Sequence, residues 1–193
     1  STKDNFNVYK ATRPYLAHSG GASISEKMVE ALNRQINAEI YSAYLYLSMA
    51  SYFDSIGLKG FSNWMRVQWQ EELMHAMKMF DFVSERGGRV KLYAVEEPPS
   101  EWDSPLAAFE HVYEHEVNVT KRIHELVEMA MQEKDFATYN FLQWYVAEQV
   151  EEEASALDIV EKLRLIGEDK RALLFLDKEL SLRQFTPPAE EEK

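Results

Sequence analysis

Segment 63–82 repeats its apolar residues at the period of an α-helix, and the same face carries a carboxylate and an imidazole. At steps of three or four residues this face presents Met65, Gln68, Glu72, His75, Met79 and Phe82. Side chains spaced in this way share one side of a helix, and a largely apolar side is the one that becomes buried. The segment therefore predicts a helix that brings Glu72 and His75 into a protein core, where ionisable groups need partners.

Glycine and proline divide the rest of the chain into further helical segments. Glycine follows three of these segments, and Ser104-Pro105 has the composition of a helix start. We predict helices over about 23–56, 60–86, 104–134, 136–166 and 170–185, and a capping box formed by Ser23 and Glu26 at the first start. About sixteen residues connect the second helix to the third. The sequence thus predicts an all-α fold, a four-helix bundle with a long crossover after helix 2 and a short fifth helix.

Composition limits where the protein works and which sites it can build. The 193 residues carry a net charge of −12 and include no cysteine. An acidic surface repels nucleic acid and anionic membranes, and no run approaches the roughly 20 apolar residues that span a bilayer. The first residues lack the apolar stretch of a secretory signal. We therefore expect a cytoplasmic protein without disulfides, whose metals are held by oxygen and imidazole.

Each of the four long predicted helices places one glutamate on its buried face, near mid-length. These residues are Glu39, Glu72, Glu116 and Glu152. One such glutamate alone has an ordinary explanation, because its carboxylate can reach solvent from a half-buried position. Four together, without lysine or arginine on the same faces, are costly to bury as anions. With His75 they predict a pair of divalent metal ions, for which this ligand set favours iron or manganese. His111 and His115 could bind another metal, but we interpret them as exposed residues of the third helix.

Four stretches of the sequence resemble the non-haem ferritins of bacteria and archaea. They read LNRQINAEIYSAYLY, WQEELMHAMKMFDFV, YEHEV and YNFLQWYVAEQVEEE, and the resemblance extends over about residues 23–185. It implies an iron-storage protein with ferroxidase activity, which oxidises Fe(II) with O₂ and keeps Fe(III) as mineral. It also implies a hollow homo-oligomeric shell, usually of 24 subunits. The fifth helix has an apolar side that its own bundle leaves uncovered, so we expect it to pack against neighbouring subunits, and packing back on its own subunit is the alternative.

The resemblance implies a role for particular residues of this chain. Glu39, Glu72 and His75 would hold the first iron, and Glu72 as a bridge, Glu116 and Glu152 would hold the second. Gln149 would lie beside the pair near the position of O₂, and Tyr46 and Trp144 would supply electrons. A third, weaker iron site would use Glu71, Glu148 and Glu151.

Departures from related families narrow the resemblance. Bacterioferritins carry a second Glu-x-x-His on the fourth helix and a haem-binding methionine, whereas this chain has Gln149 three residues before Glu152, and Leu73 directly after Glu72. The resemblance therefore implies iron as the only cofactor and no haem. Rubrerythrins need a cysteine-rich iron site, which this chain cannot build. A manganese or di-iron oxygenase on the same bundle, with one or two subunits, is the alternative.

The two ends of the chain differ from the bundle. Residues 1–18, STKDNFNVYKATRPYLAH, resemble the N-terminus of the E2 envelope glycoprotein of alphaviruses of the chikungunya type, a virion-surface protein. Residues 19–21 have the composition of a linker. The resemblance implies a fusion that displays a viral peptide to antibodies on a ferritin part, residues 22–186. Use purely as an epitope-display scaffold and a natural disordered extension are the alternatives. Residues 187–193 are predicted to form a disordered acidic tail.

Overall fold

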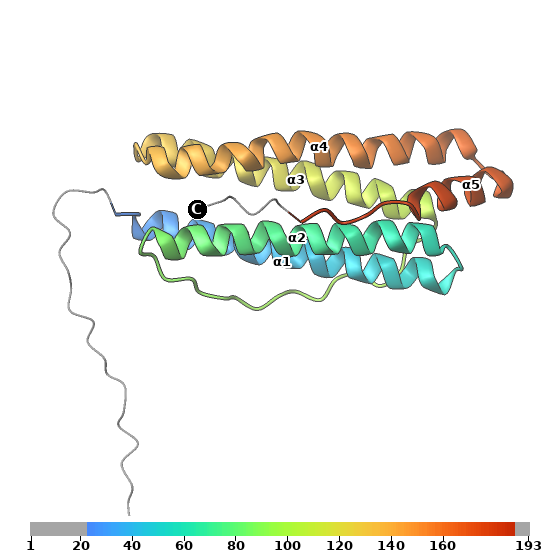
Figure 1. Ribbon diagram of the computed structural model, residues 1–193, viewed down its shortest axis with the longest axis horizontal. Coiled ribbons are helices and arrows are strands. Elements are labelled where there is room, and N and C mark those ends of the chain that lie inside the picture. The colour runs from blue at the N-terminus through green and yellow to red at the C-terminus, as the bar shows by residue number, and fades with distance from the viewer. Residues whose placement is uncertain (1–22, 188–193) are drawn as a thin grey trace, which may run out of the picture.

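Five α-helices make up most of residues 23–187, the part of the chain that the computed structural model describes. In chain order they are α1 (Glu26–Ser55), α2 (Lys59–Glu85), α3 (Pro105–Gln132), α4 (Phe136–Ile166) and α5 (Lys170–Leu180). α1 packs mainly against α2, and α3 mainly against α4, which gives the bundle of Figure 1. The predicted all-α fold is confirmed over these residues. None of the helices between residues 23 and 187 has the length and apolar character needed to cross a membrane.

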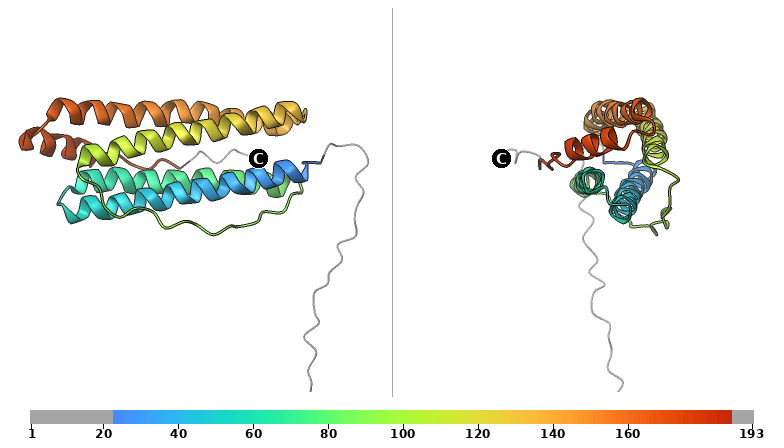
Figure 2. Two further views of the ribbon diagram at one scale, coloured as in Figure 1. Left: turned by 180° about the vertical axis from the view of Figure 1, so that it is seen from behind. Right: turned by 90° about the vertical axis from the view of Figure 1, so that its right-hand side faces the viewer.

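The connector between α2 and α3 runs along the outside of the bundle from one end to the other (Figures 1 and 2). Side-chain amides of α1 hold it in place, because Asn33 donates to the Arg89 carbonyl oxygen at 3.0 Å and Asn37 to that of Ala94 at 3.1 Å. The connector returns the chain to the end of the bundle at which α2 begins. α2 and α3 therefore point in the same direction, as the predicted crossover requires.

The start of α1 differs from the prediction. Ser25 is the capping residue, since its hydroxyl oxygen accepts a hydrogen bond from the Met28 amide at 3.0 Å. The capping box predicted for Ser23 and Glu26 is therefore wrong by two residues. The Ser25 hydroxyl also lies 2.8 Å from a carboxylate oxygen of Glu133, to which it donates, and this bond joins the start of α1 to the end of α3.

The end of α5 also differs, because the helix stops at Leu180, more than a turn before the predicted end. Asn63 of α2 supplies the reason. Its amide group donates to the carbonyl oxygens of Leu180 at 3.2 Å and Arg183 at 2.9 Å, so the chain leaves the helix and follows α2. Gly60 of α2 permits the close approach of α5, since a β-carbon at position 60 would lie 1.6 Å from the Asp177 carbonyl oxygen. The segment after α5 is thus fixed against α2.

Two hydrophobic clusters fill the bundle and leave a polar layer between them. The cluster near α5 includes Phe53, Phe61 and Phe109, whose ring centroids lie between 5.1 and 5.9 Å apart. The cluster at the opposite end includes Leu32 and Ile123, both fully buried. Packed aromatic and aliphatic side chains exclude water from both ends of the polar layer. The polar layer contains the candidate site.

Candidate metal centre

One glutamate from each long helix lies in the polar layer. Glu39 of α1, Glu72 of α2, Glu116 of α3 and Glu152 of α4 are all 8% exposed or less. Each lies between residues of the two hydrophobic clusters, as on α1, where Ile36 belongs to one cluster and Leu45 to the other. The helical period therefore buries the four carboxylates together, at the height that the sequence predicted.

These carboxylates and His75 form overlapping groups of possible ligand atoms. Glu39, Glu72 and His75 each offer one atom, and these atoms lie within 4.8 Å of one another. Glu72 also belongs to a second group of the same size, with Glu116 and Glu152. It thus occupies the position that a ligand shared by two cations requires. The structure brings together all five residues predicted to hold the pair of ions, and the identity of the ions stays a prediction.

The His75 ring lies among carboxylates. Its Nδ1 is 3.3 Å from Glu72 Oε2 and 3.9 Å from Glu39 Oε2, and its Nε2 is 3.7 Å from Glu148 Oε2. The ring of Trp144 meets it edge-on, with centroids 5.3 Å apart. Because His75 follows Glu72 by three residues on α2, both side chains leave the helix on the same side.

Two donors orient the Glu116 carboxylate. The buried Tyr46 hydroxyl donates to its Oε1, and Gln149 Nε2 donates to its Oε2 at 3.1 Å. Hydrogen bonds of this kind favour the ionised carboxylate over the protonated acid. Tyr46 and Gln149 therefore lie beside the centre, as predicted, and both contact the same ligand.

Burial favours protonated carboxyl groups in the layer. Burial, followed by repulsion from a neighbouring carboxylate, raises the pKa of Glu39 and that of Glu72 well above the usual value. Burial likewise raises the pKa of Glu116 to about 7 and that of Glu152 to about 8. The centre thus holds exchangeable protons near neutral pH.

The pKa of His75 moves in the opposite direction from that of an ordinary buried histidine. Burial lowers it, but the Glu148 carboxylate, 3.7 Å from Nε2, and the charges of other nearby carboxylates outweigh burial and raise the pKa to about 9. The same interaction lowers the pKa of Glu148. A metal ion that binds His75 must therefore displace a proton.

The donor set of the centre fits a pair of divalent cations. Glu39 Oε2, Glu72 Oε2 and His75 Nε2 are buried and have no hydrogen-bond partner within residues 23–187. Four ionised carboxylates carry a charge that two divalent cations balance while His75 is neutral. Oxygen ligands with one imidazole suit iron and manganese better than zinc.

The three residues predicted for a further iron site are not gathered in one place. Glu148 forms a group with His75 and Glu152, with ligand atoms within 4.8 Å. Glu71 instead pairs with Arg183, whose guanidinium nitrogen lies 3.0 Å from its carboxylate oxygen. Glu151 is exposed and, over the described residues, joins none of the groups that could hold a metal. This third site stays a prediction.

Two histidines of α3 are more enclosed than the sequence suggested. The Nε2 of His115 lies 2.7 Å from the Ser42 hydroxyl oxygen, and burial lowers the pKa of His115 to about 4. His111 accepts a hydrogen bond from the Trp102 indole at 3.0 Å. The prediction that both are exposed is wrong, because α1 and the connector cover this part of α3.

Two glutamine–arginine pairs extend the centre beyond the predicted residues. Gln35 donates to Glu39 at 3.1 Å, and Gln68 donates to Glu152 at 2.5 Å. Each glutamine lies four residues before a ligand glutamate of its own helix, a spacing that places their side chains side by side. This spacing is a sequence signal for the two amides. The arginines that bind these amides are Arg122 and Arg183, which lie on other elements. No spacing in the sequence therefore connects them with the glutamines.

Comparison with known proteins agrees with this geometry. The family model described as a ferritin-like domain matches residues 29–166. A bacterial non-heme ferritin of Bacteroides fragilis is 47% identical over 160 residues, which cover 83% of this chain and 99% of that protein. The crystal structure of an open pore ferritin from the hyperthermophilic archaeon Archaeoglobus fulgidus is 99% identical, with a TM-score of 0.84, and covers 85% of this chain and 100% of its own. A humanized archaeal ferritin is 94% identical, with a TM-score of 0.85, and covers 86% of this chain and 100% of its own. These matches show that the chain belongs to the ferritin family.

Proposed function

We propose that this protein stores iron and oxidises Fe(II) at the polar layer. The observation that carries the proposal is the pair of buried ligand groups joined at Glu72. Two Fe(II) ions bound to these groups would share one carboxylate, so both could give electrons to the same O₂ molecule. The charge of the four carboxylates supports two divalent ions at this position.

Fe(II) and O₂ are the substrates of this reaction. Each Fe(II) loses one electron, and O₂ takes up two electrons and two protons to leave as hydrogen peroxide. Water then hydrolyses Fe(III) to the hydrated oxide and releases protons. The protein binds Fe(II) through its carboxylates and gives up the protons that Glu116 and Glu152 hold beforehand. Tyr46 and Trp144, which lie against Glu116 and His75, are proposed to supply one further electron each when O₂ instead takes up four electrons and four protons and leaves as water.

A third, weaker iron site is part of the proposal. The group of Glu148, His75 and Glu152 supports it. Glu71 would join this site only after it leaves Arg183. The third site should therefore fill after the other two.

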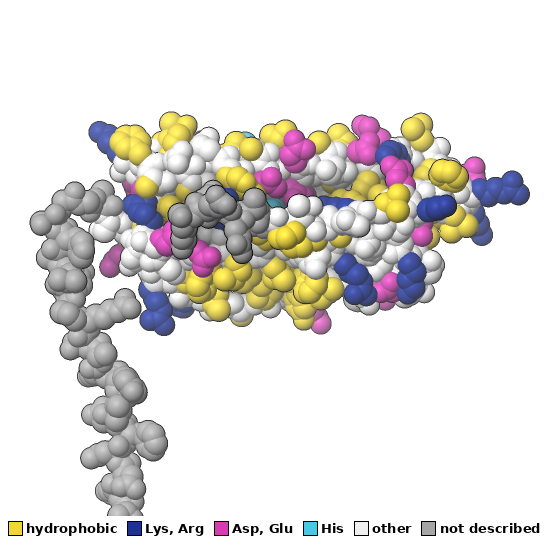
Figure 3. Space-filling model, viewed as in Figure 1, with side chains coloured by type: hydrophobic (Ala, Val, Ile, Leu, Met, Phe, Trp, Pro, Cys, Tyr) yellow, Lys and Arg dark blue, Asp and Glu magenta, His cyan; other side chains and the backbone are white. Residues whose placement is uncertain are grey.

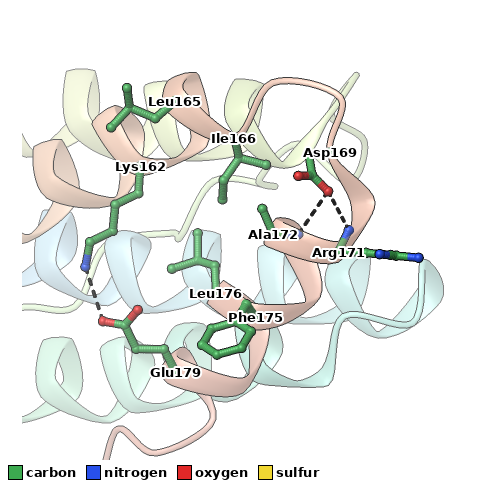
Figure 4. Close-up of a pocket in the computed structure, with 9 residues that line it drawn as sticks. All are labelled: Lys162, Leu165, Ile166, Asp169, Arg171, Ala172, Phe175, Leu176 and Glu179. Carbon is green, nitrogen blue, oxygen red and sulfur yellow. Dashed lines mark hydrogen bonds and ion pairs between the residues drawn. The ribbon is translucent and has the colours of Figure 1, made fainter.

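We further propose that the chains assemble into a 24-subunit shell. α5 exposes Phe175 at 81% and Leu174 at 60%, and a cleft of about 550 Å³ lies between α4 and α5 (Figure 4). Hydrophobic side chains also gather over α1, α2 and the connector (Figure 3), where Met77 is 51% and Leu92 65% exposed. Apolar surfaces of this extent are typical of interfaces. Light scattering tests the shell, since a di-iron oxygenase of one or two subunits would have a far smaller mass.

Mutation of the shared ligand tests the oxidation reaction. Glu72→Ala should abolish the fast phase of Fe(II) oxidation, because it removes a ligand from both ions, while the helices stay folded. Stopped-flow mixing of Fe(II) with aerated protein measures this phase. Glu125→Ala, a change at an exposed glutamate of α3, is the matched control and should keep it. An undiminished fast phase in Glu72→Ala would contradict the proposal.

A second function, display of a viral peptide, is proposed for the N-terminal end. It is supported by the resemblance of residues 1–18 to an alphavirus envelope glycoprotein, and these residues lie outside the described part of the chain. Antibodies raised against peptide 1–18 should bind assembled particles whether or not iron is loaded. Particles that such antibodies do not bind would refute this function without affecting the ferroxidase proposal.

A further inference from the structure

Arg122 of α3 contacts the metal centre through one buried amide. Its Nε donates to Gln35 Oε1 at 3.1 Å, and Gln35 Nε2 donates in turn to Glu39 Oε1 at 3.1 Å. Gln35 is 1% exposed, whereas Arg122 lies at the surface. Because one oxygen of Glu39 accepts this bond, its other oxygen, Oε2, remains for a cation beside His75.

Arg183, in the segment after α5, makes the equivalent contact on another helix. Its guanidinium donates to Gln68 Oε1 at 2.9 Å, and Gln68 Nε2 donates to Glu152 Oε2 at 2.5 Å. The same guanidinium lies 4.4 Å above the Trp64 ring and pairs with Glu71 at 3.0 Å. These further contacts fix Arg183 more firmly than Arg122.

A glutamine amide has one end that accepts hydrogen bonds and one end that donates them, so its orientation decides what it offers a carboxylate. An arginine only donates, and it therefore holds the amide oxygen toward itself. The amide nitrogen must then face the glutamate. Arg122 imposes this orientation on the amide of Gln35, and Arg183 imposes it on the amide of Gln68.

We propose that Arg122 and Arg183 are positioning residues for the metal centre, each acting through one buried glutamine. Arg122 fixes Glu39 through Gln35. Arg183 fixes Glu152 through Gln68. Gln68 also donates to Glu72, the ligand that both ions would share, at 3.5 Å, so Arg183 reaches both ions of the pair, whereas Arg122 acts on the ion held by Glu39. This inference rests on the proposed function of the site.

The direction in which cation affinity changes when an arginine is removed distinguishes positioning from simple electrostatics. A positive side chain near the centre repels cations, so its removal would strengthen cation binding if charge alone mattered. Positioning predicts the reverse, because a carboxylate that loses its orienting partner binds a metal less well. Loss of such a partner costs roughly 10- to 100-fold in metal affinity. The effect of Arg183→Ala should exceed that of Arg122→Ala, since Arg183 makes more contacts.

Anaerobic Co(II) titration of the full-length, iron-free protein tests the proposal. Calorimetry gives the affinity of each ion, and the visible absorption of Co(II) reports its ligand geometry. Wild type should bind a pair of Co(II) ions per subunit. Arg122→Ala should weaken the ion held by Glu39 by roughly tenfold or more, and Arg183→Ala should weaken at least one ion of the pair by the same factor. Each variant should also change the Co(II) spectrum. Arg34→Ala and Arg66→Ala, at arginines whose side chains pair with Glu30 and Asp54 away from the centre, are the matched controls and should match wild type.

A double-mutant cycle shows whether the arginine acts through the amide. Gln35→Leu should weaken binding by itself, and addition of Arg122→Ala should then cost little more. Arg183→Lys, which keeps a donor, should recover part of the affinity lost in Arg183→Ala. Unchanged or tighter Co(II) binding in both alanine variants would overturn this inference alone. Failure of the wild type to bind Co(II) would overturn the proposed function and this inference with it.

Discussion

Loading the metal centre with divalent cations should release protons, and the number released should fall as pH rises. The groups that titrate are His75, with a pKa of about 9, Glu152, with a pKa of about 8, and Glu116, with a pKa of about 7. A bound cation requires the ionised carboxylates and the neutral imidazole, so each of these protons must leave. The raised pKa values therefore predict how many protons are released on loading, and this number can be measured.

The count follows from the fraction of each group that is protonated before loading. These three groups together hold about three protons at pH 6 and about one and a half at pH 8. Burial also raises the pKa values of Glu39 and Glu72. Apparent affinity should therefore rise with pH, by roughly three decades per pH unit or more near pH 6.

Calorimetric titration with Co(II) in buffers of different ionisation enthalpy measures the protons directly. Glu116→Gln should remove about one proton from the release at pH 6 and very little at pH 8, since Glu116 is mostly ionised there. Glu125→Gln, at an exposed position, should release as many protons as wild type. A release below one proton at pH 6, or one that does not decrease toward pH 8, would refute this account of the centre.

Three substitutions test the elements that support the centre. Gly60→Ala places a β-carbon 1.6 Å from the Asp177 carbonyl oxygen, so α5 should shift at a cost of about 1–3 kcal/mol, seen as faster proteolysis of α5; unchanged proteolysis would refute this contact. Phe53→Ala empties a fully buried site and should cost about 3–5 kcal/mol in a denaturant titration, and a cost below 1 kcal/mol would refute tight packing there. Tyr46→Phe removes one donor to Glu116 and should slow Fe(II) oxidation roughly tenfold in stopped-flow measurements, while an unchanged rate would show that this hydrogen bond is dispensable.

The helices and the carboxylate layer were predictable because both follow from the period of one helix at a time. Glu39 and Glu72 occur on stripes of apolar residues, and burial of each stripe is a local property of its sequence. Packing of the four stripes against one another then brings the carboxylates together. Ser104-Pro105 likewise marks the start of α3 by local composition, and the Ser104 hydroxyl oxygen accepts from the Ala107 amide at 3.1 Å.

Features that depend on two distant segments were not predictable. Ser25 is the cap of α1 partly because its hydroxyl also binds Glu133, more than a hundred residues later. Arg183 reaches Gln68 because Asn63 holds the segment after α5, and no pattern around residue 183 indicates this. Burial of His115 similarly depends on α1. Such contacts are set by tertiary structure, which a single helical pattern does not encode.

The protons bound at the metal centre affect both the stability of the metal-free protein and its affinity for cations. As pH rises, stability decreases and cation affinity increases. The pKa values of Glu116 and Glu152 in the folded chain, about 7 and about 8, exceed the ordinary value of 4.5, and that of His75, about 9, exceeds 6.5. The folded state therefore binds more protons than the unfolded state between these limits, so the free energy of unfolding decreases as pH rises from about 4.5 to 9.

Cation affinity increases over the same interval, because the protons that stabilise the empty centre are those that compete with the metal. The difference in unfolding midpoint between loaded and metal-free protein should thus widen from pH 6 to pH 8. A difference that stays constant would mean that the carboxylates are already ionised in the metal-free protein. In that case the polar layer would carry an unbalanced negative charge. Burial of such charge between two hydrophobic clusters costs free energy.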